Sequence, residues 1–245
     1  MATHPAPNVW EVQGKHIDLP VRVENASIAG AVWRPPRSAV DAQLEPYGLR
    51  SAGIRGRGLA MLLCVVYPEE FVLGAYDEVG IGVYASPMSG TVPGGSGLFV
   101  LELPVTGAFT REAGREIWGL PKWLMSSTAE IGGSRSTMVM IDGGAPVMDA
   151  TIRTAALPMP LPVPSKGRTW ARAEDGPHAG RLLRGGTSMR FHGLRLGRGR
   201  GTTITWGEHR MADRARALGM DGRPFATFSA ERLSASFGES HVVDS

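Results

Sequence analysis

The chain of 245 residues has little cysteine, little lysine and no long apolar run. Its single cysteine, Cys64, excludes an intrachain disulfide and any metal or redox site built on a pair of cysteines. No apolar run reaches the roughly 18 residues that a membrane-spanning helix requires. The first residues also lack the basic and apolar segments of a signal peptide. We therefore expect a cytoplasmic protein without a membrane partner.

Glycine and proline, by contrast, are abundant. The 33 glycines and 18 prolines are scattered between apolar runs, which predicts many short strands joined by turns. Hydrophobic residues make up 42% of the chain and charged residues 20%, as is ordinary for a globular protein. A chain of this length can bury a sizeable core without a disulfide or a metal.

The spacing of apolar residues predicts a strand-rich α+β fold, an α+β or mostly-β barrel, in a single domain over residues 1–245. The proline run 157–164 reads as an extended connection and a candidate seam between two halves. Residues 1–18 read as a loose leader, and 86–96 as a loop. Helices are predicted over 40–49, 111–118 (capped by Thr110) and 208–218. Strands are predicted over 17–33, 59–67, 76–85, 98–105, 125–131, 136–141, 145–153, 187–196, 202–206 and 225–237. Cys64 lies inside one of these apolar runs and is expected to be a buried thiol.

Lys122 is the most informative single residue. It lies in an apolar segment of a chain that otherwise uses 23 arginines and only three lysines. Lysine can lose its proton and attack a carbonyl, whereas arginine cannot. Desolvation disfavours the ammonium form of a lysine, and a neutral amine can form a Schiff base that acts as an electron sink. On these residues alone, the commoner alternative is a lysine whose stem packs on tryptophan while its ammonium stays in water.

Two motifs favour a reactive Lys122 over this alternative. The run from Gly114 to Leu124, G-R-E-I-W-G-L-P-K-W-L, resembles the signature of the acetoacetate decarboxylase superfamily, in which a G-R-E run leads into P-K. The upstream Y-D-E-V-G, Tyr76 to Gly80, also resembles that family's active-site glutamate setting. The resemblance implies an antiparallel β-barrel or sheet core with a few short helices, and a homo-oligomer. It further implies Lys122 as the Schiff-base nucleophile and Glu78 as the proton-transfer carboxylate, with no cofactor and no metal.

The same motifs imply which residues bind the substrate. These are Tyr76, Arg115, Glu116, Trp118, Leu120 and Trp123, although Arg115 and Glu116 could simply brace the turn. The chain also differs from the family. Trp123 occupies the place of a second lysine, the expected arginine is absent from residues 25–28, and a second glutamate is absent from 62–64. An arginine distant in sequence, such as Arg34 or Arg153, is an alternative binder of a substrate carboxylate. These differences favour a substrate larger and more apolar than acetoacetate.

The resulting expectation is a carbon–carbon lyase that acts on a small-molecule keto acid or ketone by decarboxylation or by aldol and dehydration chemistry. Two alternatives remain open: a non-covalent cyclase or isomerase of a polyketide-like substrate, and a non-catalytic ligand-binding barrel. The P-K-W form resembles actinobacterial-type members of the family, and the arginine-rich composition suits a high-GC genome. A role in secondary metabolism is a further expectation from that resemblance.

Other signals predict no additional partner. Residues 181–216 hold nine arginines and the run G-R-G-R-G, but they carry only two aromatic residues on which bases could stack. We therefore expect no nucleic-acid partner. The six histidines are not spaced as metal ligands on one element, and the G-G-S-G run at 94–97 lacks the G-K-[ST] of a phosphate loop.

Overall fold

The computed structural model describes residues 3–6, 8–88 and 94–243. The described part contains the α-helices α1 (Arg37–Leu44), α2 (Ala108–Trp118) and α3 (Arg210–Ala217) and the 3₁₀ helices η1 (Glu45–Tyr47) and η2 (Gly176–His178). Its strands are β1 (Thr3–Ala6), β2 (Val9–Val12), β3 (Lys15–Asp18), β4 (Val21–Trp33), β5 (Leu49–Ser51), β6 (Ala60–Tyr67), β7 (Tyr76–Pro87), β8 (Gly97–Glu102), β9 (Ser126–Glu130), β10 (Arg135–Asp142), β11 (Ala145–Arg153), β12 (Val163–Arg172), β13 (Leu182–His192), β14 (Arg195–Gly197), β15 (Thr203–Trp206) and β16 (Ala226–Val242).

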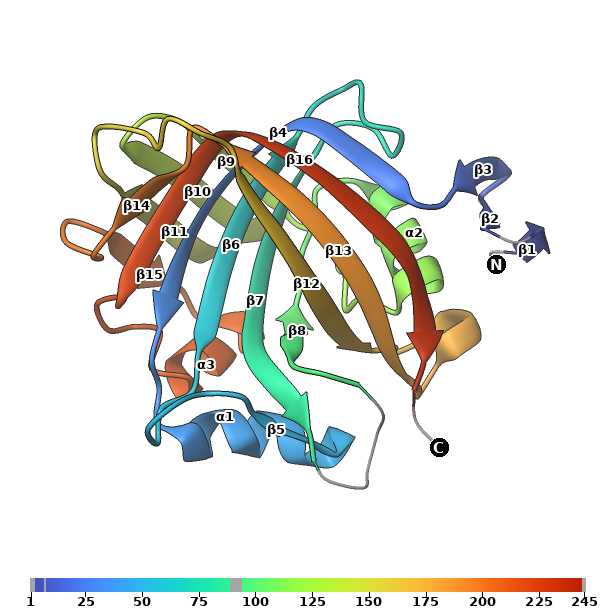
Figure 1. Cartoon of the computed structure of the whole chain (residues 1–245), viewed down its shortest axis with the longest axis horizontal. Helices are drawn as coiled ribbons and strands as arrows, with labels where there is room; N and C mark the ends of the chain where they lie inside the picture. The colour runs from blue at the N-terminus through green and yellow to red at the C-terminus, as the bar shows by residue number, and fades with distance from the viewer. Residues whose placement is uncertain (1–2, 7, 89–93, 244–245) are drawn as a thin grey trace.

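Seven of these strands close into a barrel in the order β13-β12-β8-β7-β6-β4-β16, because β16 pairs with both β4 and β13. Figure 1 shows this curved wall, with β5 and β14 at its margins. The predicted strand-rich barrel is thus confirmed. Its pairings are antiparallel except that β8 and β12 run parallel.

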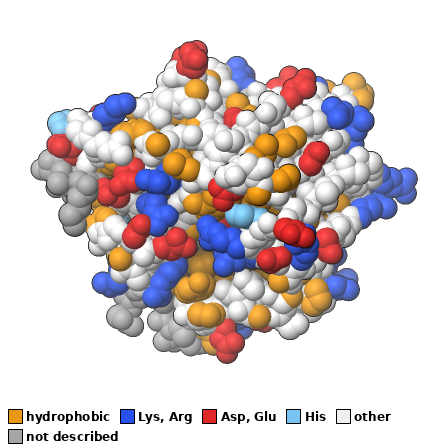
Figure 2. Space-filling model, turned by 180° about the vertical axis from the view of Figure 1, so that it is seen from behind, with side chains coloured by type: hydrophobic (Ala, Val, Ile, Leu, Met, Phe, Trp, Pro, Cys, Tyr) orange, Lys and Arg blue, Asp and Glu red, His pale blue; other side chains and the backbone are white. Residues whose placement is uncertain are grey.

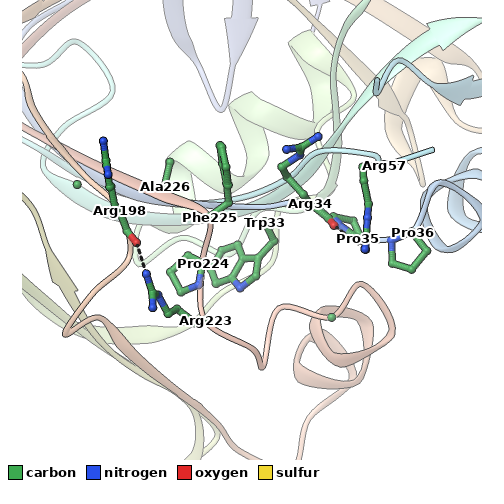
Figure 3. Close-up of a pocket in the computed structure, with 12 residues that line it drawn as sticks. Trp33, Arg34, Pro35, Pro36, Arg57, Arg198, Arg223, Pro224, Phe225 and Ala226 are labelled. Atoms are coloured by element: carbon green, nitrogen blue, oxygen red, sulfur yellow. Dashed lines mark hydrogen bonds between the residues drawn. The ribbon is translucent and has the colours of Figure 1, made fainter. Parts of the chain in front are cut away.

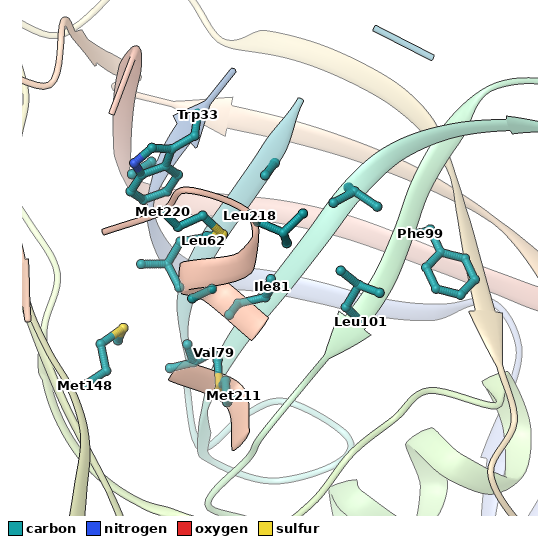
Figure 4. Packing of buried hydrophobic residues seen from close by; sticks show 14 of the residues in the cluster. Trp33, Leu62, Val79, Ile81, Phe99, Leu101, Met148, Met211, Leu218 and Met220 are labelled. Carbon is teal, nitrogen blue, oxygen red and sulfur yellow. The ribbon is translucent and has the colours of Figure 1, made fainter. Parts of the chain in front are cut away.

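A separate four-stranded sheet, β15-β11-β10-β9, lies behind the barrel in the view of Figure 1, together with α3. Alternate residues of β7, among them Val79 and Ile81, are fully buried against this layer. Met148 of β11 and Met211 of α3 belong to the same core cluster (Figure 4). Burying a side chain of this size stabilises the fold by about 1.5–3 kcal/mol, so the packing of this layer stabilises the barrel wall.

The opposite face of β6 and β7 belongs to a second core cluster. Ala113 and Ile117 of α2 pack there, as do Trp10 and Ile17 of the N-terminal strands. The prediction of a loose leader over residues 1–18 is therefore wrong, because β1, β2 and β3 form a three-stranded sheet, and Trp10, Val12 and Ile17 of β2 and β3 are buried. Cys64, as predicted, is buried, and burial raises the pKa of its thiol to about 12.

Three local predictions also need correction. α2 begins at Ala108 with Gly107 as its N-cap, and the Thr110 hydroxyl donates back to the Gly107 carbonyl from within the first turn. The predicted helix over 40–49 begins earlier and ends earlier, with its last turn tightened into η1. β12 was not predicted, because its sequence V-P-S-K-G-R-T-W-A-R contains proline, glycine and charged residues, and only Trp170 and Ala171 in it are buried.

The proline run lies between β11 and β12 and so connects the two sheets, with Leu157 and Leu161 exposed. The seam proposed there remains a prediction. Of the predicted loop 86–96, residues 89–93 lie outside the described residues. Among the described residues, no helix is both long and apolar enough to cross a membrane. On the face seen in Figure 2, basic and acidic side chains are interspersed with small apolar patches.

Candidate active site

The turn that ends α2 positions Lys122. Gly119 takes a left-handed conformation with φ of +62°, and its N–H donates to the Arg115 carbonyl, while the N–H of Leu120 donates to the Gly114 carbonyl. Glycine is favoured at such a position because a Cβ would strain the backbone. The chain therefore leaves the helix sharply and turns back along it.

Residues 121–125 then run extended beside residues 103–105. The N–H of Val105 donates to the Trp123 carbonyl over 2.9 Å, and the N–H of Met125 donates to the Val105 carbonyl over 3.0 Å. In an extended segment successive side chains point to opposite sides. Lys122 and Trp123 consequently face opposite directions, although they are neighbours in sequence.

β7 supplies the partner of Lys122. Glu78 forms a β-bridge with Val105, which brings its carboxylate to the side that Lys122 faces. The Lys122 Nζ lies 2.8 Å from Glu78 Oε2, and the side chains are only 4% and 13% exposed. This distance is within the range over which a positioned carboxylate exchanges a proton with an amine.

Two stacked tyrosines complete this side of the site. The hydroxyl of Tyr67 donates to Glu78 Oε1 over 3.3 Å, and the Tyr76 ring centre lies 5.1 Å from Lys122 Nζ. The two rings stack with centres 4.3 Å apart. Burial raises the pKa of both phenols well above the ordinary 10.0, and the charge of Glu78 adds to the shift. Both hydroxyls therefore stay protonated, and Tyr67 remains a hydrogen-bond donor to Glu78.

The absence of a side chain at Gly114 leaves room for the aliphatic stem of Lys122. A Cβ at this position of α2 would lie 2.5 Å from Lys122 Cδ and 2.7 Å from Cε. Carbon atoms do not approach this closely without a shift, so any larger residue at 114 displaces the stem. The glycine of the G-R-E motif thus has a steric role that the sequence alone did not reveal.

Arg115 braces the turn instead of facing Glu78. Its Nη1 donates to the Lys122 carbonyl over 2.6 Å, and its Nε donates to Asp175 Oδ1 over 2.8 Å. The hydrogen bonds with Asp175 are the main cause that raises the pKa of this guanidinium. Of its predicted neighbours, Glu116 is buried beside Gly176, and Trp118 donates its indole N–H to the Gly238 carbonyl over 2.8 Å.

Trp123 faces a different set of residues. Its indole N–H donates to Glu102 Oε2 over 2.9 Å, and its ring centre lies 5.0 Å from that of His209. The guanidinium of Arg210 lies 5.3 Å from the Trp123 ring centre. The structure therefore does not bring Trp123 to Lys122, because alternation along residues 121–125 directs it to the other side.

The structure brings together Lys122, Glu78 and Tyr76 from the predicted set, while their catalytic roles remain predictions. Leu120 lies in the turn itself and is partly buried. Sequence reasoning missed Tyr67, for which the only signal was its place at the end of an apolar run, where it pairs in register with Tyr76. Of the two distant arginines, Arg34 lines a separate cavity and Arg153 ends β11 in the second sheet.

Comparison with known proteins adds a family and a fold. The family model for acetoacetate decarboxylase (ADC) matches residues 1–238. No curated protein matches the chain. An acetoacetate decarboxylase from Legionella pneumophila is similar in structure, with a TM-score of 0.71 and 14% identity over 99% of this chain and 93% of that one.

Two other similar structures come from enzymes with different descriptions. The enduracididine biosynthesis enzyme MppR, complexed with the condensation product of pyruvate and imidazole 4-carboxaldehyde, has a TM-score of 0.64 and 15% identity over 93% of this chain and 91% of that one. An acetoacetate decarboxylase-like enzyme from Sphingomonas wittichii has a TM-score of 0.64 and 13% identity over 94% and 95%. At these identities the likeness shows a shared fold.

Proposed function

The chain belongs to the acetoacetate decarboxylase family, and on that premise we propose that it is a Schiff-base-forming carbon–carbon lyase for a keto acid or larger ketone. Lys122 is the nucleophile and Glu78 the proton-transfer carboxylate. The reaction is a decarboxylation or an aldol and dehydration step. The iminium on Lys122 supplies the electron sink, so the proposed chemistry uses no metal or organic cofactor.

One observation carries the proposal. A lysine that is 4% exposed has its Nζ 2.8 Å from a carboxylate that is itself 13% exposed. An ammonium must lose a proton before its nitrogen can attack a carbonyl, and Glu78 is the acceptor within reach. A structural ion pair would serve equally well with arginine, which 23 other positions of this chain use.

The steps follow from this geometry. The neutral amine of Lys122 adds to the ketone carbon, and loss of one water, together with the proton that Glu78 returns, gives an iminium. A bond from the adjacent carbon then breaks, to carbon dioxide, to an aldehyde or to a proton, and its electron pair moves into the iminium to form an enamine. Glu78 takes up and returns the protons of these steps. The ring of Tyr76 faces the nitrogen and stabilises its positive charge. Water finally releases the product from Lys122.

The substrate class is supported by a relative. MppR has been described in complex with pyruvate and with a pyruvate condensation product. These ligands belong to that protein, and they favour a keto acid for this chain as well. The proposal extends to a homo-oligomer and to a role in secondary metabolism, as the family resemblance implies.

Borohydride trapping read by intact mass tests the proposal. The protein is mixed with acetoacetate, pyruvate or an apolar methyl ketone and reduced, which converts an iminium to a stable secondary amine. We expect a single adduct that maps to Lys122, and no adduct in the matched variant Lys122→Arg, which keeps the charge opposite Glu78. The carbonyl that traps fastest identifies the substrate class.

Absence of an adduct from folded protein with every carbonyl would contradict the proposal. A non-covalent cyclase or a ligand-binding barrel would then account for the site. These alternatives predict that Lys122→Arg binds the same ligands as the parent protein, because neither requires a neutral amine.

A further inference from the structure

A second cavity lies away from the Lys122 site. It has a volume of about 1050 Å³ and is lined by Arg34, Arg57, Arg198 and Arg223. These arginines come from the end of β4, the segment before β6, the end of β14 and the segment before β16 (Figure 3). Neither Lys122 nor Glu78 lines it.

The separation from the site follows from the strand register. Ile28 of β4 lies in the same cross-strand row as Glu78, through Val65 of β6. Arg34 is six residues further along, or roughly 20 Å at the rise of an extended chain. The cavity is therefore a separate place on the barrel.

The charges of this cavity lack acidic partners. Its lining contains no aspartate or glutamate, and none of the four arginines takes part in an ion pair with another residue in the described parts of the chain. Arg57 Nη1 donates to the Arg34 carbonyl over 3.4 Å, and Arg223 Nη2 donates to the Arg198 carbonyl over 3.2 Å. Each guanidinium has five N–H donors, so most remain available for a ligand. Four like charges around one cavity repel each other, and a bound anion relieves that repulsion.

Apolar rings lie among the arginines. Trp33 forms part of the wall, and its indole N–H is fixed by the Gly222 carbonyl at 2.7 Å. Phe225 is 59% exposed, and the guanidinium of Arg34 lies 5.2 Å from its ring centre. In Figure 3 these two rings lie between the Arg34 side and the Arg198 side of the cavity. A ligand that fits this lining carries several negative charges and a flat or apolar body.

We propose that this cavity binds a small organic polyanion of the nucleoside di- or triphosphate class. Its phosphates bridge the guanidiniums, which bind phosphate oxygens through paired N–H groups. Its ring packs against Phe225, where an aromatic face and an arginine are already together. Arg198 belongs to the G-R-G-R-G run at 197–201, and this placement gives that run a role in ligand binding. A cavity with one exposed ring favours a free nucleotide over a nucleic-acid strand, which needs a row of rings on which successive bases stack.

Calorimetric titration with ATP, with inorganic triphosphate and with adenosine tests the proposal. We expect saturable binding of ATP at one site, weaker binding of triphosphate, and no binding of adenosine. Each double variant, Arg34→Gln with Arg57→Gln and Arg198→Gln with Arg223→Gln, weakens ATP binding at least about tenfold. The matched control Arg200→Gln removes an exposed arginine of the same run that does not line the cavity, and leaves ATP binding unchanged.

Several results would overturn this assignment. One is the absence of binding at millimolar ATP. Another is a loss of ATP affinity in Arg200→Gln as large as in the double variants, which would mean that binding depends on general surface charge. If triphosphate binds as tightly as ATP, and Phe225→Ala leaves ATP binding unchanged, the ring does not contribute. Tighter binding of a short single-stranded oligonucleotide than of ATP would make this surface a nucleic-acid site. Thermal melting of each variant verifies its fold.

Discussion

Two glutamates, one buried and one largely buried, lie on opposite sides of the short segment that carries Lys122 and Trp123. Glu78 is paired with Lys122, and Glu102 accepts from the indole of Trp123. Glu102 also accepts from Arg214 Nη1 over 2.8 Å and is only 2% exposed. The same backbone segment therefore presents one carboxylate to a lysine and the other to arginine and tryptophan.

The difference between the two sides lies in what each cation can do. Arginine stays protonated at all working pH values, so the Glu102 side forms a fixed tie among β8, α3 and residue 123. Lysine can give up its proton, and on the Glu78 side the hydroxyl of Tyr67 also donates to the carboxylate. The arrangement assigns anchoring to one side and leaves the other available for proton transfer.

Neutralising each glutamate in turn gives the largest test of this comparison. Glu78→Gln removes the proposed proton acceptor of Lys122, so we expect turnover or trapping to fall by about 10²–10⁴-fold, which is the usual contribution of a general base. Glu102→Gln leaves Lys122 and its partner in place but weakens a buried charge-assisted tie. We expect it to cost about 1–3 kcal/mol of stability and to leave the trapping rate within a few-fold of the parent.

Urea unfolding and borohydride trapping, measured on both variants, separate these effects. A result in which Glu102→Gln abolishes trapping while Glu78→Gln does not would reverse the roles of the two sides. Equal losses in both measurements would mean that the two carboxylates act as one network.

Gly114→Ala changes the surroundings of Lys122 and leaves Glu102 and its partners as they are. The added methyl would lie 2.5 Å from Lys122 Cδ, so the stem must shift, and we expect this shift to displace Nζ from its position beside Glu78. A misplacement of about 1 Å at a reacting group can cost 10²-fold in rate, and we expect a loss of about 10- to 100-fold in trapping. Helix stability does not fall, since alanine is favoured over glycine in a helix interior by about 1 kcal/mol.

A matched control for this change is Gly132→Ala, where the nearest atom to the new methyl is Glu231 Cγ at 3.9 Å. We expect no change in trapping for that variant. If Gly114→Ala also traps at the parent rate, the stem has another path to Glu78, and the steric role assigned to Gly114 is wrong.

Much of the barrel could be predicted from the sequence, because β6 and β7 are continuous or alternating apolar runs bounded by turn residues. β12 could not, since its pairing with β8 and β13 rests on backbone hydrogen bonds, and only two of its side chains, Trp170 and Ala171, are buried. The N-terminal strands were missed for a related reason. Their few apolar residues are buried only because α2 and the barrel wall provide a surface for them, and that surface comes from distant parts of the chain.

The candidate site was likewise predicted only in part. Lys122 and Glu78 were predicted from residue type and motif, and the structure brings them to 2.8 Å. Tyr67 was missed because it reaches Glu78 through the β6–β7 register, which a single sequence does not reveal. Trp123 was expected beside Lys122 because it is adjacent in sequence, yet the extended course of residues 121–125 sends it to Glu102. Contacts set by strand alternation need the partner strand to be known.

The smallest predicted effect concerns η2. Its N-cap Asp175 accepts from Arg115, which in turn donates to the Lys122 carbonyl. His178 ends η2 with its ring centre 6.0 Å from that of Trp10. Burial lowers the pKa of His178 below its usual 6.5, and the charge of Arg181 lowers it further. The folded state therefore resists protonation. Its contribution to stability is present above pH 6.5 and is lost as the pH falls through the lowered pKa.

Urea unfolding between about pH 7.5 and 5.5 measures this contribution. We expect His178→Gln to flatten the fall in stability across that range by less than about 1 kcal/mol, because the imidazole is only partly shielded from solvent. The exposed His241→Gln is the matched control and should leave the slope unchanged. A slope that is the same in His178→Gln as in the parent would mean that η2 does not respond to this histidine. In that case neither the Asp175–Arg115 contact near Lys122 nor the Glu102–Arg214 contact near Trp123 would respond to pH in this range.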